Sequence, residues 1–310
     1  MSQIFENKAS PKRGYTATLN AQKVSGNWTG GIGVDVQTDK WDPNDLGIFN
    51  GNNFINTSFG VQYQQVEPNK LFQQSQIWVN YNHNWQFSSK RFMDFGINWG
   101  AWGQFKNQWW VNWWSYLQPT TTVDFFESRT GTDFKVPAFY NTGFNFGSDE
   151  RKKLMFRLFV GLRKQDLPDN MTYRFQFSPR YRLNNRLSFE HQIYFDKRLN
   201  EVGFASRNEN DVTVGRRDRS TIENIFSSNL KFNAKANLTF RARHYWSQVA
   251  YNQYFKLEND GSWSPRDWSK NENRNTNIFN IDMIILGNSP LVALSNMIWK
   301  ISNFKNENWM

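Results

Sequence analysis

The amino-acid sequence predicts an all-β protein whose strands form an antiparallel transmembrane β-barrel of about 14–15 strands. The composition is the first observation: mean hydropathy is −0.75 and 38% of the residues are hydrophobic, yet 17% are aromatic. Disordered chains are poor in aromatic residues. A membrane barrel accounts for both properties, because its strands alternate lipid-facing apolar residues with lumen-facing polar ones, and aromatic residues gather at both membrane interfaces.

The second observation is an alternation of apolar and polar residues with a period of two. Leu154, Phe156 and Leu158 take alternate positions of one segment, and Arg157 and Arg163 take intervening positions. Because successive side chains of a strand point to opposite faces, we expect the first three on the outer face and both arginines on the inner face. The same alternation recurs in the segments 79–87, 93–99, 173–181, 187–195 and 238–246.

The third observation is the contrast between short and long junctions. Short turns are expected near Lys90, Asn185 and Ala234. Long polar junctions are expected at 39–53, 119–137, 199–220 and 259–275. Outer-membrane barrels have short turns at one end and long loops at the other, so we expect the two sets at opposite ends of the sheet.

A soluble β-sandwich or propeller is the alternative fold, because its strands alternate in the same way. Charged residues such as Glu190, Asp196 and Arg241 recur within the alternating segments, where a hydrated barrel interior suits them. The segments also run for roughly 9–14 residues, which is longer than most soluble strands and matches a tilted membrane crossing. Both features favour the membrane barrel.

We expect the chain to comprise a leader segment, residues 1–12, and a partial barrel domain, residues 13–310. No apolar run is long enough for a transmembrane helix, and the N-terminus lacks the charged and apolar regions of a signal peptide. The hypothesis is that the chain is a fragment whose upstream strands are missing. Its first and last strands, near 14–23 and 290–304, should then not form a full hydrogen-bonded ladder with each other.

Composition also limits the chemistry. The absence of cysteine excludes disulfides, thiolate zinc sites and iron–sulfur clusters, and no cofactor is expected. The net charge of +10 is spread along the chain, with one local cluster at 216–219. Nucleic-acid binding proteins concentrate their basic residues on one face, so outer-membrane lipid, and not nucleic acid, is the expected partner.

The aromatic segment 109–116 is the strongest candidate for ligand contact. Trp110, Trp114 and Tyr116 share one side of a strand, and Trp109 and Trp113 share the other. Lipid-interface packing explains the outer set. The inner set, Trp110, Trp114 and Tyr116, is then left for contact with a glycan, since ring faces pack against the apolar faces of sugars.

Two acidic groups are weaker candidates. Asp42, Asn44 and Asp45 offer oxygen ligands for calcium, although an Asx-turn network in a long loop is the alternative. Asp124 and Glu127 are a possible carboxylate pair for glycoside hydrolysis. Neither group forms a catalytic motif, and no catalytic residue is predicted; whether the protein is an enzyme is left open, with a non-enzymatic role favoured.

Several motifs resemble those of one family. They are DPNDLG at 42–47, FKVP at 134–137, VGRRDRSTIEN at 214–224, RARHYWS at 241–247, YNQY at 251–254 and FNIDM at 279–283. Together they resemble the C-terminal barrel domain of an uncharacterised Bacteroidota outer-membrane family, a domain of unknown function that commonly follows a carbohydrate-binding-like module. The resemblance implies an outer-membrane location. It covers about residues 14–300, and carries over no catalytic residue.

Three functions remain open at this point. The leading hypothesis is a non-enzymatic outer-membrane barrel that anchors, or passes material for, a glycan-binding module absent from this chain. The alternative is a surface-exposed carbohydrate-active hydrolase whose catalytic part lies outside this chain or in its loops. A further alternative is a non-functional gene remnant. The expected partners are outer-membrane lipid, a glycan, the missing N-terminal half of the barrel and the carbohydrate-binding-like module.

Overall fold

The computed structural model describes residues 13–41, 52–124, 127–130, 132–208, 211–234, 236–289 and 292–307, with side chains described as far as residue 286. The candidate calcium ligands Asp42, Asn44 and Asp45 lie outside the described residues, as does the expected leader segment. Within the described part of the chain, no helix is both long and apolar enough to cross a membrane.

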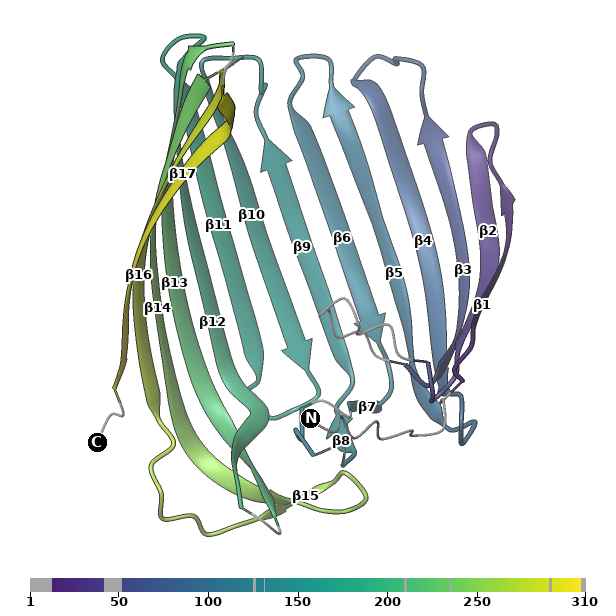
Figure 1. Ribbon diagram of the computed structural model, residues 1–310. Coiled ribbons are helices and arrows are strands. Elements are labelled where there is room, and N and C mark those ends of the chain that lie inside the picture. The colour runs from purple at the N-terminus through teal and green to yellow at the C-terminus, as the bar shows by residue number, and fades with distance from the viewer. Residues whose placement is uncertain are drawn as a thin grey trace, which may run out of the picture.

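The described residues form strands joined by turns and loops (Figure 1). The strands are β1 (Thr16–Lys23), β2 (Trp28–Gln37), β3 (Phe54–Gln65), β4 (Phe72–Gln86), β5 (Phe92–Phe105), β6 (Trp110–Gln118), β7 (Thr122–Asp124), β8 (Phe134–Val136), β9 (Phe139–Gly147), β10 (Leu154–Gln165), β11 (Met171–Arg182), β12 (Leu187–Arg207), β13 (Val212–Asn233), β14 (Ala236–Leu257), β15 (Trp263–Pro265), β16 (Arg274–Ser289) and β17 (Val292–Glu307).

All strands but β7 and β8 belong to one antiparallel sheet, in which neighbours follow chain order except that β9 comes next to β6 and β16 next to β14. Strands β7 and β8 form a separate pair, and the short β15 extends the edge of β14. The sheet curves so that its first and last strands come forward, and β7 and β8 lie at the lower end of the hollow (Figure 1). The predicted all-β antiparallel class is therefore confirmed.

The two edges of the sheet remain separate. Strand β1 pairs with β2, and β17 pairs with β16, with no ladder between β1 and β17 among the described residues. This confirms the prediction that the first and last strands do not pair with each other. The structure is an open, strongly curved sheet and not a closed barrel.

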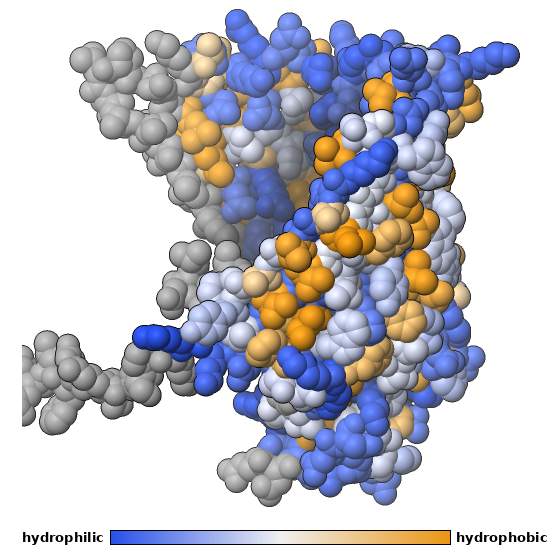
Figure 2. Space-filling view, turned by 90° about the vertical axis from the view of Figure 1, so that its right-hand side faces the viewer, coloured by the Kyte–Doolittle hydropathy of each residue, from blue (hydrophilic) through white to orange (hydrophobic). Residues whose placement is uncertain are grey.

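The two faces of the sheet differ in polarity. One row of the outer face, in register across six strands, is Trp113, Phe144, Val160, Phe175, Phe195 and Ile222. The adjacent row of the inner face is Trp114, Gly143, Gly161, Arg174, Asp196 and Thr221. Figure 2 shows apolar side chains over the middle of the outer surface and hydrophilic ones gathered towards both ends.

The facing predicted for β10 is confirmed. Leu154, Phe156 and Leu158 lie on the outer face, where Leu154 is 60% exposed. Arg157 and Arg163 lie on the inner face, on the side of the cavity beneath β7 and β8. Strand alternation alone fixes this outcome, because β10 contains no bulge.

The placement predicted for the turn at Lys90 is wrong. Residues 87–91 join β4 to β5 at the same end of the sheet as the long loops: Arg91 forms an ion pair of 2.5 Å with Asp133, which belongs to the junction 119–137. Successive connections of an antiparallel meander alternate between the two ends, and this parity decides the placement whatever the length of a turn. The turns at Asn185 and Ala234 lie at the opposite end, as predicted.

The prediction of a long loop at 199–220 is also wrong. Strands β12 and β13 continue through it and leave 208–211 as their connection. The pairing shifts between Arg198 and Glu201 and again between Phe204 and Ser206. Asn200 has a left-handed backbone with φ of 51°. These bulges change which face each residue takes, so the alternation that marks a strand is broken although the strand goes on.

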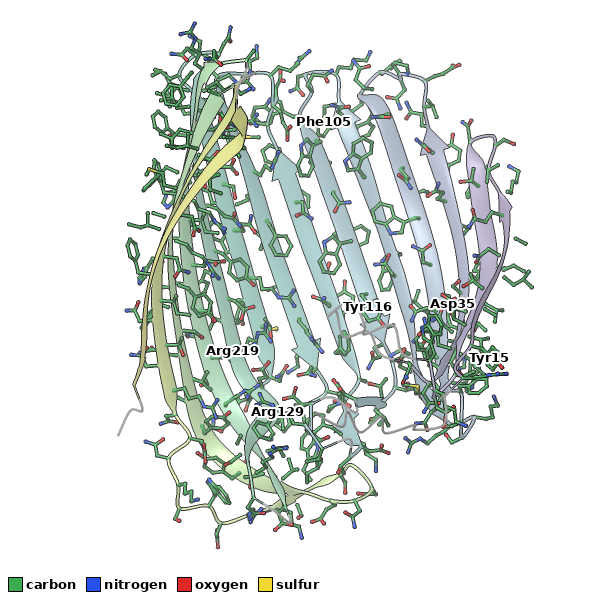
Figure 3. The ribbon with its side chains drawn as sticks, in the orientation of Figure 1. Tyr15, Asp35, Phe105, Tyr116, Arg129 and Arg219 are labelled. Carbon is green, nitrogen blue, oxygen red and sulfur yellow. The ribbon has the colours of Figure 1, made fainter. Side chains whose placement is uncertain are left out.

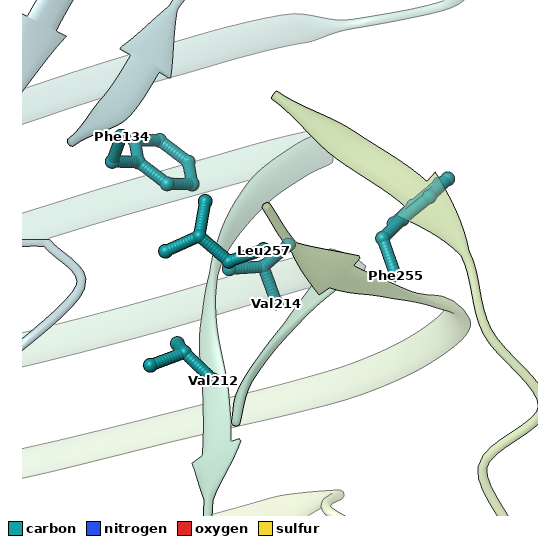
Figure 4. Packing of buried hydrophobic residues seen from close by; sticks show 5 residues of the cluster. All are labelled: Phe134, Val212, Val214, Phe255 and Leu257. Atoms are coloured by element: carbon teal, nitrogen blue, oxygen red, sulfur yellow. The ribbon is translucent and has the colours of Figure 1, made fainter. Parts of the chain in front are cut away.

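A small apolar core lies where the β7–β8 pair meets the extended ends of β13 and β14. Its buried members are Phe134, Val212, Val214, Phe255 and Leu257 (Figure 4). The ring of Phe134 stacks on Trp263 of β15 with centroids 5.6 Å apart. This core fixes β7 and β8 against the inner face, close to the candidate site.

Candidate ligand site on the inner face

Side-chain amides cover the inner face of the N-terminal half of the sheet. Asn84 joins two neighbours, since its Oδ1 accepts from Asn56 at 2.7 Å and its Nδ2 donates to Asp94 at 2.8 Å. Further along, Asn145 donates to Asn112 at 3.1 Å. Amide groups paired across strands satisfy one another and still offer hydrogen bonds to solvent, so this half is a polar surface rich in amide groups.

The predicted contact residues Trp110, Trp114 and Tyr116 share the inner face. Their rings lie against glycines of neighbouring strands: a methyl group built on Gly143 would be 2.7 Å from the ring of Trp114, and one on Gly147 would be 2.3 Å from that of Trp110. Tyr116 covers Gly96 of β5 in the same manner. One side of each ring is thus used in covering the sheet, and their contact with a glycan stays a prediction.

A polar cavity of about 330 Å³ opens on the inner face next to Tyr116. The register places Tyr116 opposite Asn141, Asn141 opposite Arg163, and Thr172 between Arg163 and Arg198. The cavity is lined by Asn141, Arg163, Gln165, Thr172, Arg174, Tyr194, Arg198 and Glu201. Figure 3 shows Tyr116 and Arg219 from the hollow side of the sheet. The residues that line the cavity, together with Asp196, Arg217 and Arg219, are called the basic cluster below.

The two carboxylates of the basic cluster are shared among several arginines. Asp196 is buried and lies 2.8 Å from Arg198 and 3.8 Å from Arg174. Glu201 lies 2.8 Å from Arg198, 3.2 Å from Arg217 and 3.4 Å from Arg219. Each carboxylate is therefore held by more than one guanidinium, and positive charge is in excess.

Glu201 is ionised in this setting. Burial favours the neutral form of its carboxyl, but Arg217, Arg219 and Arg198 together outweigh burial and hold the pKa of Glu201 below its ordinary value. A general acid needs a pKa near the working pH. Glu201 is thus suited to fixing the arginines and not to proton transfer.

The predicted carboxylate pair, Asp124 and Glu127, borders a smaller cavity of about 170 Å³ beside the basic cluster. The backbone N–H of Glu127 donates to Asp124 at 3.1 Å, and the carboxylate of Glu127 accepts from the backbone N–H of Phe204 at 2.7 Å. Glu127 therefore ties the loop to β12. Among the described residues, no group of three or more histidine, aspartate or glutamate side chains is arranged to hold a metal ion.

The sequence predicts the inner-face positions of Tyr116 and Arg163, but not the cluster that joins them. Arg174 and Arg198 reach Arg163 through the register of β10, β11 and β12. The turn between β10 and β11 is short, so arginines near the two ends of that turn were the available signal. Placing Arg198 needs the bulge beside Asn200, which alternation does not reveal.

Comparison with known proteins gives a family and no characterised relative. No curated protein and no solved structure matches the chain. The match to a family covers residues 1–299 and therefore includes the whole of the basic cluster, the inner-face aromatics and the β7–β8 pair. The chain belongs to the family described as a domain of unknown function, DUF5916.

Proposed function

We propose that the chain forms part of an outer-membrane β-barrel of a Bacteroidota bacterium, with its outer face in lipid and its inner face lining an aqueous lumen. It acts as a non-enzymatic anchor, or conduit, for a glycan-binding module carried elsewhere in the protein. The observation that carries the proposal is the polarity of the sheet, apolar on the outside and polar on the inside. In a soluble β-sandwich the apolar face packs against a second sheet.

The outer face of β11 has the residue order of a membrane strand. Tyr173 and Tyr181 lie at its two ends, and Phe175 and Phe177 lie between them. Tyrosine is enriched at both membrane interfaces, and apolar side chains at the hydrocarbon level. Tyr173 to Tyr181 is a stretch of nine residues, which matches the roughly 9–11 residues with which a tilted strand crosses the hydrocarbon core.

The open edges set a requirement on the rest of the barrel. Unpaired backbone amides in lipid cost several kcal/mol each, so spanning sheets close on themselves. Strands β1 and β17 each have one free edge in the described part of the chain. We therefore propose that further strands of the same protein complete the barrel, and that a carbohydrate-binding-like module is joined to it.

The anchoring role is favoured over a hydrolase. Two carboxyl groups with different protonation states are required for glycoside hydrolysis. The carboxylate of Glu201 is held ionised by three arginines, and that of Glu127 is engaged by the backbone of β12. Neither carboxylate is placed to donate a proton to a leaving group.

Paired cysteine variants test the membrane proposal; residues 1–310 contain no native cysteine, and the unsubstituted protein gives the background labelling. Phe175→Cys lies on the outer face and Gln176→Cys on the inner face of the same strand. In isolated membranes that contain the full-length protein, a water-soluble maleimide is expected to label the second variant and spare the first. A spin label at 175, and not at 176, is expected to respond to lipid-soluble oxygen. Equal labelling of both positions by the maleimide, before any detergent is added, contradicts the proposal.

A further inference from the structure

The basic cluster contains one arginine that no carboxylate neutralises. Asp196 and Glu201 form ion pairs with Arg174, Arg198, Arg217 and Arg219. Arg163 lines the same cavity and forms no ion pair or hydrogen bond with any described residue. A cation that faces a cavity in which positive charge is in excess attracts an anion from solution.

Buried donors without a partner are a second indication that the basic cluster binds an anion. The Nε atoms of Arg163, Arg174 and Arg219 are buried and lack a hydrogen-bond partner in the described part of the chain. A buried donor without an acceptor is costly, so such groups are rare in folded proteins and mark sites that a ligand or water completes. Two of these donors, those of Arg163 on β10 and Arg174 on β11, belong to residues that line the same cavity.

Aromatic rings border the cavity on the side of Arg163. The guanidinium of Arg163 lies over the ring of Phe139, 3.9 Å from its centroid, and the rings of Phe139 and Tyr116 are 5.6 Å apart. Stacking fixes the guanidinium plane and leaves its outer N–H groups available for a planar oxyanion. Asn141, Gln165 and Thr172 add neutral hydrogen-bonding groups to the walls.

We propose that the basic cluster binds an acidic monosaccharide, whose carboxylate is held by Arg163 and whose hydroxyl groups meet the neutral polar side chains. The charge excess selects an anion, and the planar guanidinium suits a carboxylate. The neighbouring ring of Tyr116 and the amide-bearing walls suit a sugar ring. This inference rests on the inner-face residues and does not depend on the sheet lying in a membrane.

Calorimetric titration of the full-length protein in detergent micelles tests the inference with three probes: sodium glucuronate, glucose and sodium sulfate. Glucuronate is expected to bind saturably and at least about tenfold more tightly than either other probe. Arg163→Gln is expected to weaken glucuronate binding at least about tenfold, and Arg163→Lys to weaken it less, because lysine keeps the charge but lacks the fork of donors.

Arg157→Gln is the matched control, since Arg157 lies on the same face of β10 but pairs with Glu150 at 2.7 Å. This variant is expected to bind glucuronate like the parent protein, and circular dichroism compares the β-structure of all variants. Equal binding of glucose and glucuronate, or an affinity unchanged by Arg163→Gln, overturns the proposal. Sulfate binding as tight as that of glucuronate overturns the assignment to a sugar. Failure of the membrane-labelling test leaves these outcomes unaffected, so the two proposals are tested separately.

Discussion

Asp149 shows how one residue sets the stability of a turn. It lies in the connection between β9 and β10, where its carboxylate accepts from the backbone N–H of Arg151 at 3.0 Å and from the guanidinium of the same residue at 2.9 Å. These hydrogen bonds lower the pKa of Asp149 from 3.8 to about 2. Hydrogen bonds to the ionised form stabilise it relative to the unfolded chain.

The pH dependence of this turn follows from that shift. Because the folded pKa is lower than the unfolded one, the contribution of Asp149 is fully present above pH 3.8 and is lost as the pH falls towards 2. We expect the exchange protection of the Arg151 amide to fall over this range. Asp149→Asn should remove the pH dependence, which hydrogen exchange with mass spectrometry measures. A pH dependence that persists in this variant contradicts the assignment.

The cover of Gly143 by aromatic rings predicts a second single-residue effect. A methyl group at this position meets Trp114 at 2.7 Å and Phe159 at 2.8 Å. Gly143→Ala is therefore expected to lower the free energy of unfolding by about 1–3 kcal/mol, the usual cost of overpacking. Urea denaturation of the detergent-solubilised protein measures it. In a Trp114→Leu background the loss should shrink, and strictly additive losses would show that ring contact is not the cause.

At the scale of the elements, the docking of the β7–β8 pair depends on the packing of Phe134. Phe134 is 3% exposed and packs with Val214 and Leu257 at the base of the hollow. Phe134→Ala is expected to destabilise the docking of this pair by about 3–5 kcal/mol. Limited proteolysis should then cleave within residues 119–138 faster than in the parent protein. Lys135→Ala, which removes an exposed ion pair with Asp260, is the control and should leave the cleavage rate nearly unchanged.

Sequence alternation predicts the elements well where the strands lack bulges. The outward facing of Leu158 and the inward facing of Arg157 follow from it directly. It fails between 199 and 220, because the bulges at Asn200 and Ala205 change the phase, and polar residues then resemble a loop. It also fails for the turn at Lys90, because turn length says little about which end of a sheet a turn occupies.

The candidate site is predictable only in part, for a related reason. Tyr116 and Arg163 are assigned to the inner face by alternation alone. Their approach to Arg198 depends on the pairing of four strands, which a single sequence leaves undetermined. Sites made by register across several strands are therefore the least visible part of such a sequence.

At the scale of the whole molecule, the separate edges of the sheet predict that residues 1–310 alone do not close into a barrel. Residues 1–310 expressed alone are expected to give no heat-modifiable band in detergent gels, because β1 and β17 form no ladder with each other in the described structure. The full-length protein, with the proposed additional strands, is the positive control and should give such a band. A heat-modifiable monomer from residues 1–310 alone contradicts the proposal that further strands complete the barrel.

The length of β12, β13 and β14 has a mechanical consequence. Strand β13 has 22 residues, which span roughly 70 Å at about 3.3 Å per residue, whereas the apolar band on β11 takes up less than half of that length. Strands β12, β13 and β14 stay paired on both sides of the bulges near Asn200 and Ala205, so the projecting end is joined to the membrane part by three paired strands and not by a single-stranded linker. A module attached to this end would hold a set angle to the bilayer plane, and its binding surface would sweep a narrow cone instead of turning freely.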